Sequence, residues 1–147
     1  MTNFGVLLGI CGLNPDSAAV FLDTPRRRVI RWIRGGVIPP ETAISALSEL
    51  HQQQQKIADA IMESWDNSGR PAELSITVAA DDESARETGW PSVGAQMVAP
   101  MIAQTYIWPA KVELAQAVKP VTGDADQGQP DDAESIQSDD SKTIAAE

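Results

Sequence analysis

Two helix-start signals that lie ten residues apart constrain the fold of this chain more than any other feature. Asn14-Pro15-Asp16 combines an N-cap residue, a proline at the first helical position and an acid that complements the helix dipole. Thr24-Pro25 repeats this signal, so the helix that starts near residue 15 is short and the connection to the next helix is tight. Gly35-Gly36 is a C-cap signal that ends the second helix. The sequence therefore predicts two short helices joined by a tight turn.

Helical segments are also predicted on both sides of this pair. The apolar segment 4–13 could suggest a secretory signal, but no Lys or Arg precedes it. We therefore expect this segment to be a buried first helix. From Glu41 to about Asp66 apolar residues recur at helical spacings, at Ile44, Leu47, Leu50, Ile57, Ile61 and Trp65. The glutamines at 52–55 interrupt this pattern, so the long helix is expected to be exposed there or to break in two. Residues 1–66 are predicted to form an all-α domain.

Residues 67–119 are predicted to form a small α+β dimerisation element with one strand and one or two helices. The segment 73–79 alternates apolar and polar residues like a half-buried strand. A single strand has no partner inside the chain, so we expect it to pair with the same strand of a second subunit. The acids 81–83 are expected to form a turn, and 92–106 a helix that Pro100 kinks or interrupts. The residues assigned to the dimer interface are Leu74, Ile76, Val78, Trp90, Met97 and Met101.

The uncharged run 88–110 is long enough to span a bilayer. It contains three prolines and several polar residues, which favour burial within protein instead. We therefore expect no membrane partner and a cytoplasmic location.

Charge is segregated along the chain. The net charge of −10 argues, taken whole, against a nucleic-acid binder. However, the first 40 residues hold five arginines against two aspartates, whereas residues 120–147 hold eight acids against the single cation Lys142. The charge must therefore be interpreted segment by segment. Low apolar content and high acidity predict that the segment 120–147 is a disordered acidic tail.

The five arginines fall within the second helix of the predicted pair. A helix over residues 25–34 carries Val29, Trp32 and Ile33 on one face, and the other face carries Arg26, Arg27, Ile30, Arg31 and Arg34. The major groove of DNA admits a helix, and arginine donates two hydrogen bonds to guanine or neutralises phosphates. A solvated chance cluster is the simpler alternative, but the surrounding helix pair favours DNA binding.

The segment 14–35, NPDSAAVFLDTPRRRVIRWIRG, resembles the helix-turn-helix of the Cro/lambda-repressor (XRE-type) superfamily. Ala19 matches the small residue where the two helices touch, and Asp23 stands where the family commonly has a turn glycine. Other matches are the apolar positions Ala18, Leu22, Val29 and Trp32, followed by Gly35 and Ile38-Pro39-Pro40. The resemblance implies base reading by Arg26, Arg27, Ile30 and Arg31, and phosphate contacts by Arg28 and Arg34. The order of elements is similar to that of autorepressors encoded beside anti-CRISPR genes, in which the C-terminal part holds a dimer together.

These features predict a transcriptional regulator that binds an inverted-repeat operator in double-stranded DNA. The expected form is a homodimeric repressor, autoregulatory or phage-derived. The alternative is an antitoxin or another protein-interaction module whose acidic tail binds a basic partner. The tail is also a candidate DNA mimic that competes for the arginine helix.

Catalysis and metal binding are not expected. Cys11 and His51 are the only cysteine and histidine, too few for a typical zinc site. Cys11 lies in an apolar segment and is predicted to be a buried structural thiol. We therefore predict no catalytic residues, no cofactor and no metal.

Overall fold

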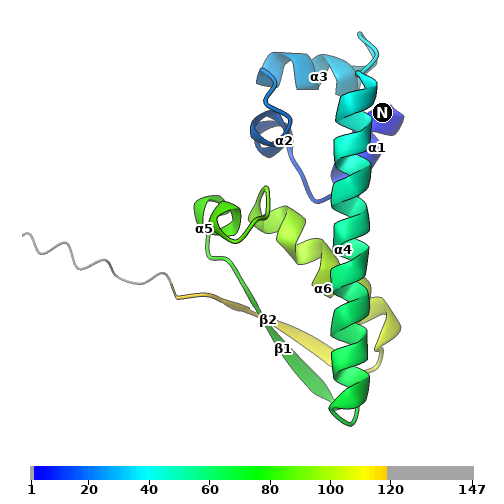
Figure 1. Ribbon diagram of the computed structural model, residues 1–147, viewed down its shortest axis with the longest axis vertical. Coiled ribbons are helices and arrows are strands. Elements are labelled where there is room, and N and C mark those ends of the chain that lie inside the picture. The colour runs from blue at the N-terminus through cyan, green and yellow to red at the C-terminus, as the bar shows by residue number, and fades with distance from the viewer. Residues whose placement is uncertain (1, 119–147) are drawn as a thin grey trace, which may run out of the picture.

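The computed structural model describes residues 2–118, which are mainly helical with one small parallel sheet (Figure 1). The elements in chain order are α1 (Asn3–Ile10), α2 (Pro15–Phe21), α3 (Arg26–Arg34), α4 (Glu41–Asn67), β1 (Glu73–Val78), α5 (Asp82–Glu87), α6 (Val93–Tyr106) and β2 (Lys111–Gln116). Helix α4 forms the long axis of Figure 1, with α1, α2 and α3 beside its first half and the sheet beside its second half. The acidic tail predicted at 120–147 lies outside the described residues.

The first helix begins where Thr2 caps it and buries one side against α3. The Thr2 hydroxyl accepts the N–H of Gly5 at 3.2 Å and lies 3.1 Å from the Trp32 carbonyl oxygen. Phe4 packs edge-on against the Trp32 ring, with the ring centroids 5.5 Å apart. Phe4 and Leu8 are buried, as predicted for the apolar segment 4–13. Helix α1 thus supports the apolar side of α3.

Helix α4 is continuous through its four glutamines. Exposure, one of the two predicted alternatives, is found for Gln52, Gln53 and Gln55. The fourth glutamine, Gln54, is fully buried. The Gln54 amide Nε2 donates to the carbonyl oxygens of Cys11 and Ala95, each at 2.9 Å. The alternative that α4 breaks at the glutamines is therefore wrong. Through these two hydrogen bonds, Gln54 links the end of α1 to α6 across α4.

The strand predicted at 73–79 has its partner within the chain. Strand β1 pairs with β2 in parallel, in a register that runs from Glu73 opposite Lys111 to Val78 opposite Gln116. Parallel strands need a crossover connection, and α5 and α6 supply it. The prediction that this strand lacks an internal partner is therefore wrong. Pairing with a second subunit is not needed to complete the β1 ladder.

The structure also bears on two smaller predictions after β1. The predicted turn at the acids 81–83 is wrong: the Asp81 carboxylate accepts the N–H of Ser84 at 2.8 Å and caps α5, which begins at Asp82. Pro100 lies inside α6 without interrupting it, so of the two predicted alternatives the interruption is absent and the kink stays a prediction. One face of α6 is buried, through Ala95, Ala99, Pro100 and Ala103.

No single helix within residues 2–118 is long and apolar enough to cross a membrane. Helices α1 and α2 reach that length and apolarity only as a pair, and they are bent by 86° at the break between them.

Candidate nucleic-acid interface

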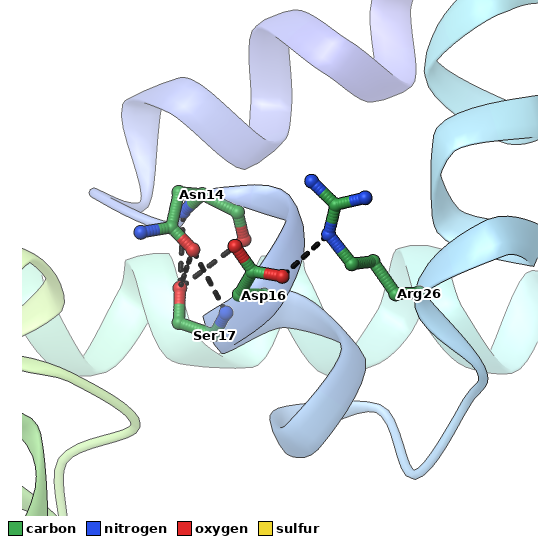
Figure 2. A network of polar contacts seen from close by, with 4 residues as sticks. All are labelled: Asn14, Asp16, Ser17 and Arg26. Carbon is green, nitrogen blue, oxygen red and sulfur yellow. Dashed lines mark hydrogen bonds and ion pairs between the residues drawn. The ribbon is translucent and has the colours of Figure 1, made fainter.

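Helix α2 begins at Asn14, as the sequence predicts, and a reciprocal pair of hydrogen bonds fixes its first turn (Figure 2). The Asn14 side-chain oxygen accepts the backbone N–H of Ser17 at 2.8 Å. The Ser17 hydroxyl in turn accepts the backbone N–H of Asn14 at 3.0 Å. This capping box satisfies two N–H groups that a helix start otherwise leaves unpaired. The start of α2 is therefore set by residues close to one another in the sequence.

The turn between α2 and α3 depends on an unusual backbone conformation at Asp23. Its φ of 47° lies in the left-handed region that favours glycine, at the position where the XRE-type pattern commonly has one. The N–H of Thr24 then donates to the Ala19 carbonyl at 2.9 Å. The predicted side-chain cap by Thr24 is wrong, because its hydroxyl donates to the Leu22 carbonyl and Pro25 takes the N-cap position of α3.

Helix α3 has a buried apolar side and a charged exposed side. Val29 is 0% and Trp32 is 3% exposed, and both belong to the core that α1 and α4 also line. The helix ends at Gly35, whose φ is 79°, at the predicted C-cap. All five arginines are exposed: Arg26, Arg27, Arg28, Arg31 and Arg34. We call these five side chains the arginine face.

The arginine face is the main positive feature of this part of the chain. Residues 2–118 hold nine Lys and Arg against thirteen Asp and Glu, and α3 carries five of the nine cations. No acid occurs between Asp23 and Glu41 in the sequence. Four of the five arginines form no ion pair with any residue in 2–118: Arg27, Arg28, Arg31 and Arg34. The surface of α3 is therefore available to a polyanion.

Arg26 differs from the other four arginines, because its Nε bonds the Asp16 carboxylate on α2 (Figure 2). The two side chains are 58% and 70% exposed, so this pair adds little to stability. Figure 2 shows the two terminal guanidinium nitrogens of Arg26 pointing away from Asp16. Sequence reasoning assigned Asp16 only to the helix dipole. No local sequence pattern predicts this contact, because its two residues lie ten positions apart on different helices.

The base-reading and phosphate-contacting residues implied by the resemblance all lie on α3. Ile30 is half-buried, and the arginines of both sets are exposed. Their division into base readers (Arg26, Arg27, Ile30 and Arg31) and phosphate contacts (Arg28 and Arg34) stays a prediction.

The residues assigned to a dimer interface lie mostly within the fold of the single chain. Leu74, Ile76 and Val78 occupy the alternate, less exposed positions of β1, and Trp90 packs against the core. Met97 is half-buried in α6. Met101 is 60% exposed beside a small apolar groove between α6 and β2, lined by Pro100, Met101, Gln104, Val112 and Leu114. Of the six, Met101 is the one most available to another molecule.

Two glutamines on α6 cover parts of the outer edges of the sheet. The Gln104 amide donates to the Ala110 carbonyl and accepts the N–H of Val112, both at 2.7 Å. At the end of β1 the Gln96 side-chain oxygen accepts the N–H of Ala79 at 2.8 Å. These side chains occupy backbone groups that another strand needs for pairing.

Cys11 is a buried thiol, as predicted. Its Sγ lies 3.4 Å from the Leu47 carbonyl oxygen, and burial raises its pKa to about 11. A thiol with this pKa is protonated at neutral pH and is a poor nucleophile. Among residues 2–118, no three His, Cys, Asp or Glu side chains come together as a metal site.

No protein-family model matches the chain, and no curated protein has significant sequence similarity to it.

Proposed function

We propose that the chain is a sequence-specific regulator of transcription that binds double-stranded DNA as a homodimer and represses a nearby operon. In this proposal α2, the turn at Asp23 and α3 act as a helix-turn-helix, and α3 enters the major groove. The observation that carries it is the arginine face, which lies on a short helix whose opposite side is fixed in the core through Val29 and Trp32.

The spacing along α3 suits a helix in the groove. Arg27, Arg31 and Arg34 follow one another at four and three residues, so they lie along one side of the helix. Arginine on such a row can donate two hydrogen bonds to guanine O6 and N7, while its neighbours neutralise phosphates. Because the buried side is anchored, DNA binding need not order the helix first.

Arg26 fits the same interpretation through its contact with Asp16. The carboxylate holds Nε, which leaves the two terminal nitrogens free to donate to one base. Asp16 would then orient a base-reading arginine from the neighbouring helix.

A dimer is part of the proposal, since two linked half-sites bind far more tightly than one. The expected operator is an inverted repeat with half-sites about one helical turn apart. With β1 paired inside the chain, the support for a dimer is this functional requirement together with the exposed Met101 beside its groove.

Selection from a randomised duplex pool, followed by binding measurements at fixed salt, tests the proposal. We expect Arg31→Ala to weaken operator binding by about 1–3 kcal/mol and to relax preference at one base pair. Arg34→Ala should weaken operator and scrambled DNA alike. Arg86→Ala, an exposed arginine on α5, serves as the control and should change neither. If no sequence is enriched, or if Arg31→Ala and Arg34→Ala act identically on both DNAs, the proposal fails and the protein-interaction alternative gains support.

A further inference from the structure

Four of the five side chains of the arginine face lack counter-charge on the part of the chain that the structure describes, and the fifth, Arg26, pairs with Asp16. Arg27 and Arg31 lie one helical turn apart, a spacing at which like charges repel. Neither they nor Arg28 and Arg34 form an ion pair with residues 2–118. The other four cations in these residues lie on separate elements, and one of them, Arg70, is already paired with Asp66. The arginine face is thus the one concentrated site here for an anionic ligand.

The sequence beyond β2 supplies an anionic ligand in the same chain. Residues 120–147 contain eight acids and one lysine, including the neighbouring pairs Asp131-Asp132 and Asp139-Asp140. Carboxylates bind guanidinium groups by charge-assisted hydrogen bonds, as phosphates do. The five positive charges of α3 and the eight negative charges of this segment are complementary.

The length of chain after Val118 is sufficient to bring the two together. The 13 residues from 119 to 131 reach at most about 45 Å when fully extended, and all 29 residues from 119 to 147 reach about 100 Å. Helix α4, with 27 residues, is about 40 Å long. Helix α3 and the carboxyl end of β2 both fall within the extent of α4 along the long axis of Figure 1. The first aspartate pair, at 131 and 132, therefore lies within reach of the arginine face.

We propose that the acidic segment 120–147 occupies the arginine face when DNA is absent and competes with DNA for it. Its regulatory meaning rests on the proposed function, whereas the contact itself does not. Because both partners are in one chain, their encounter has an effective concentration in the millimolar range, so weak ion pairs suffice. An intramolecular competitor lowers the affinity for every DNA sequence by the same factor.

A paramagnetic label on the segment tests the contact without DNA. Ser138→Cys introduces the attachment site in the full chain, and buried Cys11 does not compete for the reagent. We expect the label to broaden the backbone amide signals of α3, and not those around Arg70. Raised salt, or the combined Arg27→Ala and Arg31→Ala substitutions, should restore the α3 signals. Equal broadening of α3 and the Arg70 region, or none, overturns the proposal.

Neutralising the segment tests the competition. The full chain carrying Asp131→Asn, Asp132→Asn, Asp139→Asn and Asp140→Asn should bind operator and scrambled DNA about five-fold or more tightly, by the same factor. A control with the same change in net charge replaces four exposed acids of the described residues by amides: Asp59, Glu63, Glu73 and Glu87. This control should gain less than about two-fold, because salt screens charges that lie far from the arginine face. Equal gains overturn the competition. A positive label result in a chain that binds no DNA upholds the contact and overturns the proposed function instead.

Discussion

Replacing Gln54 by methionine tests whether one buried amide joins the N-terminal helices to the α6 region. Gln54 is 0% exposed, and its Nε2 donates to the carbonyls of Cys11 and Ala95. Its Oε1 is buried without a hydrogen-bond partner among residues 2–118. Methionine has a similar length and a good helix propensity, so Gln54→Met removes the hydrogen bonds with little change in volume.

The expected loss follows from these contacts. A buried carbonyl that loses its donor costs about 1–3 kcal/mol, and two are affected. Methionine also removes the unpartnered Oε1, whose burial carries a cost of similar size. The net decrease in the free energy of unfolding should therefore be about 1–3 kcal/mol.

Urea denaturation followed by circular dichroism measures this loss. With a typical m-value, the unfolding midpoint of Gln54→Met should fall by about 1 M. Gln53→Met, one residue earlier on the exposed side of α4, is the matched control and should stay within about 0.5 kcal/mol of the wild type. Coinciding midpoints for the two variants would refute the idea that the Gln54 amide stabilises this junction.

Three further predictions concern other parts of the fold. Gly94→Ala places a Cβ 2.3 Å from the Gly12 carbonyl oxygen and should lower the free energy of unfolding by about 1–3 kcal/mol. Gly9→Ala places a Cβ that meets no other part of the fold within 4 Å and should raise the free energy of unfolding by about 0.5–1 kcal/mol. Thermal denaturation compares the two variants. Cys11 should resist alkylation at pH 8 unless the protein is unfolded. Because burial raises its pKa from 9.0 to about 11, its contribution to stability should be complete below pH 9 and decline as the pH rises toward 11, which denaturation at several pH values checks. Met101→Asp should shift the mass measured by light scattering from dimer to monomer and weaken operator binding; a wild-type monomer at micromolar concentration contradicts the proposed dimer.

The sequence by itself determined the elements whose signals are local. The Asn14 cap, the start of α2 and the Gly35 end of α3 involve residues only a few positions apart, so their pattern is visible along the chain. The same holds for most of the arginine face, because helical periodicity alone separates Arg27, Arg31 and Arg34 from the side that carries Val29 and Trp32. Arg28 lies one turn before Trp32, so its exposure does not follow from periodicity. For the candidate site, sequence thus predicted the helix that carries it and the residues that it exposes.

Tertiary structure decided the features that depend on distant partners. Strand β1 alternates clearly, but its pairing with β2 is a contact between residues 38 positions apart, and α6 has to fold back to make it. Gln54 looked like one of four exposed glutamines, and it is buried because Cys11 and Ala95, 43 and 41 residues away, present carbonyl oxygens to its amide. The Asp16–Arg26 pair likewise exists because the turn at Asp23 brings α2 beside α3. Such contacts arise from packing, and packing depends on the whole chain rather than on any local pattern.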